Sequence, residues 1–152
     1  MRITQQWLDE YGESHQNPFN KMTHWVCVPL IVWSVLAMFW SIPLRPTESP
    51  WVNVATFVYV AALVFYFRLS LNLGLGMLVV GGLMLYICRT IEMAGWPLFY
   101  IALAVFVLAW IGQFYGHKVE GKKPSFIKDV VFLLIGPIWL LSFVYKKAGI
   151  AF

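Results

Sequence analysis

Charged side chains are scarce in this sequence. Asp, Glu, Lys and Arg make up 12% of its 152 residues, whereas hydrophobic residues make up 61%. A soluble domain carries about 25% charged and about 45–50% apolar residues. So few charges cannot cover a water-facing surface, which excludes an ordinary soluble protein. We therefore expect one integral-membrane domain over residues 1–152, a length too short for two ordinary domains.

Cysteine is scarce as well, with two residues in the chain. Cys27 and Cys88 both lie inside apolar segments, where a free Cys behaves as a small hydrophobic side chain. We expect two buried thiols, although the pattern leaves a disulfide open. The first twenty residues are polar and contain no short apolar core followed by a small-residue cleavage site, so the sequence predicts no cleavable signal peptide.

Long apolar runs dominate the rest of the chain. Four of them, which together cover residues 25–115, are predicted to span the membrane at about 25–42, 51–67, 73–88 and 96–115. A fifth run within residues 129–152 is interrupted by Gly136-Pro137 and has about 16 residues, fewer than the ~20 that a spanning helix needs. It is either a kinked fifth span or a re-entrant hairpin. The predicted fold is an all-α, polytopic membrane helix bundle of four spans plus one of these two alternatives.

The first 24 residues form a polar segment predicted to lie at the membrane interface. Its aromatic and apolar residues have the spacing of a short amphipathic helix. Asn17 followed by Pro18 indicates the start of a second helix, because Asn is a good cap and Pro is tolerated at the first helical position. A helix that continues from Pro18 places Asn20 and His24 on one face.

Cationic residues predict the orientation of the chain. Four spans separate the N-terminal segment from the basic loop at 116–128, so both lie on one side of the membrane. This side carries seven cationic residues: Arg2, Lys21, Arg68, Lys118, Lys122, Lys123 and Lys128. The opposite side carries Arg45 and Arg89, joined by Lys146 and Lys147 if the last run spans. The positive-inside rule places the N-terminus and the basic loop in the cytoplasm.

Only three histidines occur in the chain, and the span count brings all of them to one face of the membrane. His15 and His24 lie in the N-terminal segment, and His117 lies at the start of the basic loop. Imidazole is a common ligand of Zn and Fe. Glu120 follows His117 by three residues and would share its side of a helical turn. The metal set is therefore either three His, or two His with Glu120 as in a facial triad. A single interfacial His more often only forms hydrogen bonds, because its ring is amphipathic; three on one face favour a metal.

Lys118, Lys122 and Lys123 surround the predicted site. Attraction to anionic lipid headgroups explains each of them taken singly, at about 1 kcal/mol per residue. The alternative is that they bind the carboxylate of a substrate whose alkyl chain stays in the bilayer. With the neighbouring polar residues Asn20 and Gln113, they are our candidates for binding substrate.

Two segments resemble a known family. Residues 11–29 read YGESHQNPFNKMTHWVCVP and residues 110–126 read WIGQFYGHKVEGKKPSF. Both segments, and the apolar pattern between them, resemble the membrane 2-hydroxy fatty acid dioxygenases of fungi and bacteria. The resemblance covers nearly the whole chain. It implies that iron binds at His15, His24 and His117.

The resemblance also implies an activity. Members of that family depend on Fe(II) and shorten 2-hydroxy fatty acids by one carbon in α-oxidation, by cleaving the bond between C1 and C2 with dioxygen. For this chain it implies a fatty-acid substrate, membrane lipid as surroundings, no nucleic acid, and a bacterial inner membrane. His15, His24, His117 and Glu120 are then the candidate catalytic residues. The sequence does not indicate chain-length preference or oligomeric state.

Proteins of other classes remain as alternatives. A non-catalytic membrane protein that binds anionic lipid, or a zinc-dependent membrane hydrolase, would carry the same residues. A di-iron hydroxylase is disfavoured because soluble di-iron bundles use four carboxylates and two His. A transporter is disfavoured because no predicted span has a charged residue at its centre.

Overall fold

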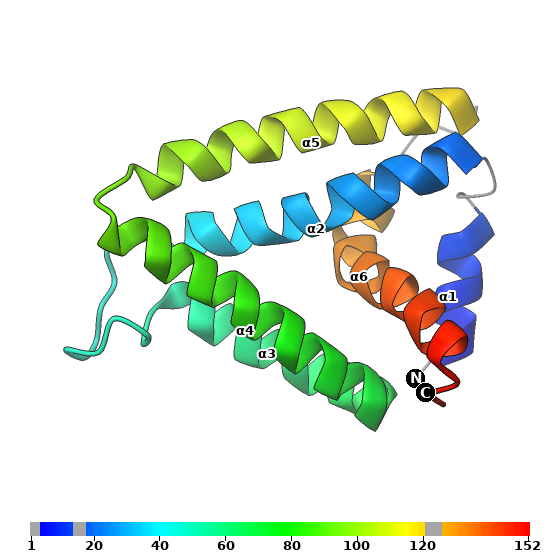
Figure 1. Ribbon diagram of the computed structural model, residues 1–152, viewed down its shortest axis with the longest axis horizontal. Coiled ribbons are helices and arrows are strands. Elements are labelled where there is room, and N and C mark those ends of the chain that lie inside the picture. The colour runs from blue at the N-terminus through cyan, green and yellow to red at the C-terminus, as the bar shows by residue number, and fades with distance from the viewer. Residues whose placement is uncertain (1–3, 14–17, 121–125) are drawn as a thin grey trace.

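The computed structural model describes residues 4–13, 18–120 and 126–152; within these ranges the side chains at 7, 10–13, 117, 119–120 and 126–133 are not described. The chain forms six helices in these ranges: α1 (Thr4–Glu13), α2 (Pro18–Trp40), α3 (Val54–Leu69), α4 (Leu71–Met93), α5 (Leu98–Glu120) and α6 (Phe126–Ala148) (Figure 1). The predicted all-α membrane bundle is confirmed. The predicted short N-terminal helix and the predicted helix start at Pro18 are confirmed as well.

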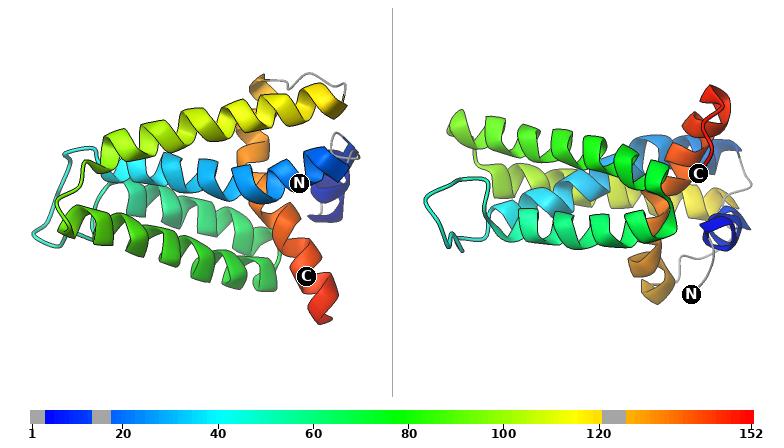
Figure 2. Two further views of the ribbon diagram at one scale, coloured as in Figure 1. Left: turned by 45° about the horizontal axis from the view of Figure 1, so that its top comes forward. Right: turned by 90° about the horizontal axis from the view of Figure 1, so that it is seen from below.

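The helix α2 packs along α5, and the two run in opposite directions (Figures 1 and 2). Small residues face this interface, among them Ala109 and Gly112. A Cβ atom on Gly112 would lie 2.7 Å from Cys27 Sγ, so the glycine is what permits this approach. In lipid, the hydrophobic effect does not drive helices together, so the van der Waals contacts of such a close approach stabilise the pair instead. Cys27 and Cys88 are both buried free thiols, as expected.

The helices α3 and α4 form a second antiparallel pair, joined by Ser70 (Figure 1). The backbone N–H of Ser70 donates to Tyr66 O at the end of α3, and its hydroxyl accepts from the N–H of Leu73 at the start of α4. Ser70 thus provides hydrogen-bond partners for a backbone C=O at the end of α3 and for a backbone N–H at the start of α4. The ring of Tyr59 lies directly against Gly81, so the glycine at this position lets α3 pack closely on α4.

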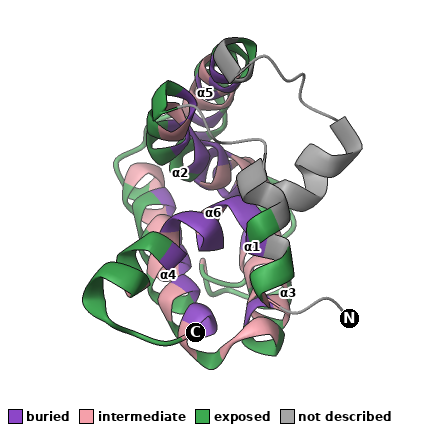
Figure 3. Ribbon diagram, turned by 90° about the vertical axis from the view of Figure 1, so that its right-hand side faces the viewer, coloured by how far each residue is buried: buried purple, intermediate pink, exposed green. Residues whose placement is uncertain are grey.

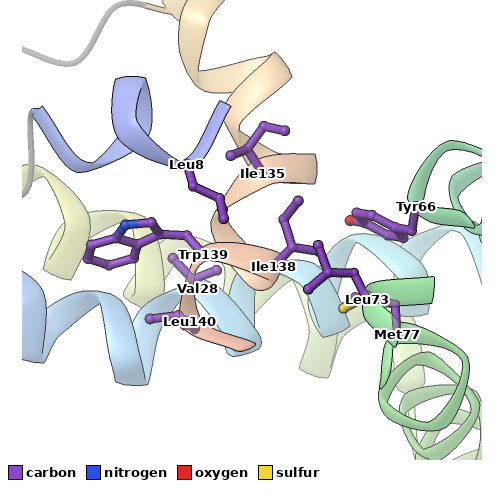
Figure 4. Close-up of a cluster of buried hydrophobic side chains, with 9 residues drawn as sticks. All are labelled: Leu8, Val28, Tyr66, Leu73, Met77, Ile135, Ile138, Trp139 and Leu140. Atoms are coloured by element: carbon purple, nitrogen blue, oxygen red, sulfur yellow. The ribbon is translucent and has the colours of Figure 1, made fainter. Parts of the chain in front are cut away.

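The last apolar segment is one helix, α6, so the structure has the continuous helix and not a two-part hairpin. It crosses the other helices steeply instead of running alongside them (Figure 2). Its buried side chains meet α1, α2, α3 and α4 in one apolar cluster, which Figure 4 shows. The cluster consists of Leu8, Val28, Tyr66, Leu73, Met77, Ile135, Ile138, Trp139 and Leu140. Figure 3 shows that buried positions of α2 and α6 are turned toward the middle of the molecule.

Helix lengths agree with the predicted spans, although the boundaries differ. Among the described residues, α2, α4 and the Leu98–Gly116 part of α5 are long and apolar enough to cross a membrane, and α3 is a shorter apolar helix of 16 residues. The basic loop is shorter than predicted, because α5 continues to Glu120 and α6 begins at Phe126. The polar residues 18–24, predicted to lie at the interface, form the first two turns of α2 because they pack against α5.

At the other end of the bundle, Glu92 connects α4 with α2 and the loop that follows it. Its carboxylate accepts from Trp40 Nε1 at 2.8 Å, from Arg45 at 3.2 Å and from Arg89 at 2.7 Å. Arg45 also donates to the backbone O of Trp40 and of Pro50. The contacts of Glu92 with Trp40 and Arg45 join residues about fifty positions apart, so the sequence alone did not indicate them.

Candidate polar site between α2 and α5

The start of α2 and the end of α5 meet at Gly116. A Cβ atom at this position would lie 2.5 Å from both Asn20 Oδ1 and Thr23 Oγ1. Contacts this short do not occur for real Cβ atoms, so only glycine fits here without a shift. One position away along the chain, the rings of Phe19 and Tyr115 meet edge to face at 5.6 Å. Residues 18–24 and 113–120 therefore lie at the same end of the bundle, as the count of four spans predicted.

His24 is buried on the interior side of α2, with 1% of its surface exposed. Its Nδ1 lies 2.9 Å from the backbone O of Asn20, one turn earlier in the helix. A carbonyl oxygen only accepts, so Nδ1 carries the hydrogen and the lone pair of the neutral ring resides on Nε2. Metal-bound histidines commonly have this arrangement, in which a backbone carbonyl fixes the tautomer and the ring orientation.

Asn20 and Gln113 are buried polar residues in the same region. Asn20 is 0% exposed and Gln113 is 6% exposed. Gln113 lies on the face of α5 that carries the buried residues Ala109 and Gly116. Within the part of the chain that the structure describes, Gln113 Oε1 and Trp110 Nε1 are buried without a hydrogen-bond partner. Leaving such groups unmatched costs about 1–3 kcal/mol each, so this acceptor and donor are suited to a polar ligand.

The predicted site residues divide into three groups. Asn20 and His24 are buried on α2, and Gln113 is buried on α5 at the same end of the bundle. His117 and Glu120 belong to the last turn of α5, one and four positions after Gly116, and their side chains are outside the described residues. His15, Lys122 and Lys123 also lie outside the described residues. The helical turn expected between His117 and Glu120 is present in the backbone.

The chemical types of the described residues suit a metal centre. His24 offers an imidazole nitrogen in the required tautomer, and Gln113 Oε1 offers a buried oxygen on α5. Among the described side chains, no group of three His, Cys, Asp or Glu is close enough to hold an ion. His15, His117 and Glu120 fall outside that search. The metal ligands thus stay a prediction: His15, His24 and His117, with Glu120 as the alternative to one of them.

Lys118 is exposed at the end of α5, two residues after the buried Gly116. Its role in binding substrate stays a prediction. Sequence reasoning gave no structural role to Gly116 or Thr23, although both lie where the two helices touch. The spacing of four between Gly112 and Gly116 is the signal that could have found them, because it marks one face of a helix made for close contact.

Fold and site together define a helical membrane protein with a buried polar centre at one end of its bundle. A family model described as 2-hydroxy-palmitic acid dioxygenase Mpo1-like matches residues 1–148. The chain therefore belongs to the Mpo1-like family, and the resemblance seen in its sequence is confirmed.

Comparison with curated proteins gives a distant relative. The 2-hydroxy-palmitic acid dioxygenase MPO1 of Saccharomyces cerevisiae is 28% identical to this chain over 144 residues, which cover 91% of this chain and 78% of the yeast protein. No solved structure matches.

Proposed function

We propose that this protein is an Fe(II)-dependent dioxygenase that cleaves the C1–C2 bond of long-chain 2-hydroxy fatty acids. The observation that carries the proposal is the family match over residues 1–148, together with the buried His24 in the α2–α5 interface. The yeast relative bears the name of a 2-hydroxy-palmitic acid dioxygenase, which supports the same substrate class here.

His24, His15 and His117 would hold the iron, with Glu120 as the alternative to one histidine. When bound, the iron would supply a template for substrate and dioxygen and a source of electrons. The hydrogen bond from His24 Nδ1 to Asn20 O keeps Nε2 as the donor nitrogen.

The surrounding residues would bind the polar end of the substrate. The side-chain amide of Gln113 and the indole N–H of Trp110 can form hydrogen bonds with the 2-hydroxyl and the carboxylate. Lys118, Lys122 and Lys123 can offset the carboxylate charge at the membrane surface. Asn20 and His24 are almost fully buried, so the packing of α2 on α5 excludes water from the reacting groups.

The overall reaction balances without a further reductant. One 2-hydroxy acid and one dioxygen give a fatty acid shorter by one carbon, carbon dioxide and water. The C1–C2 bond breaks, C2 is oxidised to a carboxyl group, and dioxygen receives the four electrons. We place the protein in a bacterial inner membrane with this end of the bundle toward the cytoplasm, where the cationic residues of the chain are concentrated.

The test is the metal content of detergent-purified protein prepared without oxygen, followed by addition of 2-hydroxypalmitate and air. We expect close to one iron per chain and release of the fatty acid with one carbon fewer. The His117→Ala variant should lose both. Ile111→Ala, which changes an exposed residue on the same helix, should keep both.

Other results would direct the assignment elsewhere. Zinc in place of iron, with no oxygen-dependent product, would favour a membrane hydrolase. No metal after reconstitution with iron, and no product, would leave a protein that binds anionic lipid.

A further inference from the structure

Two apolar cavities, each partly open, lie on the side of α2 that faces α4. The outer cavity, of about 170 Å³, begins at Trp25 and Pro29 of α2 and lies between α2, α4 and α6. The inner cavity, of about 120 Å³, lies between α2, α3 and α4 and reaches as far as Leu36 and Val58. Together they approach about 300 Å³, the lower end of the range for ligand pockets.

Three residues line both cavities: Val32, Met77 and Met84. A thin partition of side chains therefore separates the two spaces. Two of the three are methionines, whose flexible side chains adapt to the shape of a ligand. A rotation of these side chains can join the cavities into one channel. Figure 4 shows Met77 beside Leu73 and near Tyr66, where α4 faces α3.

The walls are apolar even where tyrosines contribute. The hydroxyl of Tyr66 donates to Leu134 O at 2.8 Å, and the hydroxyl of Tyr59 donates to Leu78 O at 2.5 Å. Both hydroxyls are thus engaged by helix backbone, so the two rings offer apolar surface to the inner cavity. A channel of this kind suits a hydrocarbon chain and not a polar ligand.

The channel begins one residue after His24 along α2 and extends away from the end of the bundle that carries the polar site. Trp25 follows His24 directly in α2, and Leu36 lies twelve residues after His24, a rise of about 18 Å. This depth is more than half of the ~30 Å hydrocarbon core of a bilayer. An amphiphile whose carboxylate lies near Asn20 and Gln113 would therefore find an apolar path for its chain.

We propose that the channel formed by the outer and inner cavities binds the alkyl chain of the 2-hydroxy fatty acid, with its terminal carbon against Val58, Tyr59 and Ala62. The identity of the ligand rests on the proposed function; the position of the chain rests on the cavities. The chain is held within the protein, between α2, α3 and α4, and not in the surrounding lipid.

The test uses a 2-hydroxypalmitate analogue with a diazirine at its terminal carbon. Full-length protein in nanodiscs is irradiated without oxygen, so that binding is measured without turnover. We expect the label on the cavity-lining residues Val58, Tyr59 and Ala62 of α3 and on Met77 and Met84 of α4, with competition by unlabelled 2-hydroxypalmitate. A phospholipid with the same diazirine at its chain end should instead label exposed residues such as Phe57, which is 77% exposed.

A matched pair of variants sharpens this test. Ala62→Phe fills the inner cavity, whereas Ala61→Phe adds the same side chain at the exposed neighbouring position. We expect Ala62→Phe to weaken labelling about tenfold, the equivalent of roughly two methylenes that lose their burial. Ala61→Phe should label like the wild type. If Ala62→Phe does not fold, the positions labelled in the wild-type protein test the channel by themselves.

The outcomes separate this inference from the proposed function. Labelling confined to Phe57, Val60 and other lipid-facing residues, unchanged by Ala62→Phe, would overturn the channel even in a protein that forms product. If the cavities are labelled, unlabelled ligand competes, and the protein still turns over no 2-hydroxy acid, the channel is supported. The proposed dioxygenase activity is then contradicted.

Discussion

Gly116 of α5 packs directly on Asn20 of α2, with no space between them for a side-chain carbon. A Cβ atom at position 116 would be 2.5 Å from Asn20 Oδ1. The same contact region contains Thr23, and His24 is one position further along α2. The approach of two backbones thus fixes where the polar residues of the site lie relative to one another.

Gly116→Ala should therefore separate the two helices at the site. We expect a loss of about 1–3 kcal/mol in stability, the usual cost of an overpacked interior, and lower metal content and activity. Thermal unfolding in detergent and metal analysis measure the two effects. Gly82→Ala is the matched control, because its Cβ would meet no atom closer than 3.8 Å. Equal behaviour of the two variants would contradict the close contact.

Gln113→Leu should affect ligand binding more than folding. The substitution conserves volume and removes a buried oxygen that has no hydrogen-bond partner among the described residues. We expect an unchanged or higher Tm, because the cost of that buried oxygen disappears, and a KM for 2-hydroxypalmitate raised about tenfold by loss of one hydrogen bond. Phe114→Leu, at an exposed position of the same helix, should change neither. A marked fall in Tm for Gln113→Leu would show that Gln113 is structural.

Glu92→Ala should destabilise the bundle without changing the polar site. Trp40 is fully buried, and its Nε1 would lose its acceptor at a cost of about 1–3 kcal/mol. The ion pairs with Arg45 and Arg89 add little, because their side chains are about a third exposed. Glu92→Gln keeps an acceptor and should recover most of the stability.

Glu48→Ala, in the exposed loop near the same end, is the control for this experiment and should behave as the wild type. Metal content should be the same in all these variants, since the site is at the opposite end of the bundle. A loss of metal in Glu92→Ala at a temperature where the protein is folded would contradict this separation.

Tyr66→Phe should weaken the attachment of α6 to α3. The change removes the hydrogen bond from the Tyr66 hydroxyl to Leu134 O and leaves the shape of the inner cavity nearly unchanged. We expect a loss of about 1 kcal/mol, seen as a lower Tm. Tyr86→Phe, at a position 63% exposed, should have no effect. An unchanged Tm for Tyr66→Phe would show that this hydrogen bond adds nothing to stability.

Much of the fold could be predicted because lipid imposes simple rules. Apolar runs gave the helices, Asn17-Pro18 gave the start of α2, and the even number of predicted spans brought residues 20 and 116 to one end. The steep crossing of α6 could not be predicted, because its direction depends on contacts of Ile135 and Ile138 with four other helices. Neither could the contacts of Glu92 with Trp40 and Arg45, which come from distant parts of the chain.

Part of the candidate site could also be predicted from the sequence. Periodicity placed Asn20 and His24 on one face of a helix, and the structure has them buried there. The close contact at Gly116 depends on how two helices pack, which a pattern along one helix does not contain. The three-histidine set stays a prediction, because His15 and the side chain of His117 are outside the described residues.

The shortness of α3 has a consequence for the membrane itself. Its 16 residues rise about 24 Å, less than the ~30 Å hydrocarbon thickness of a typical bilayer. The hydroxyl of Thr4 in α1 donates to Leu69 O, the backbone oxygen at the end of this helix, so the amphipathic helix is held at the depth where α3 ends. Such hydrophobic mismatch thins the adjacent leaflet. The protein should therefore partition into thinner bilayers, and the bilayer should be thinnest beside the end of α3 that α1 contacts.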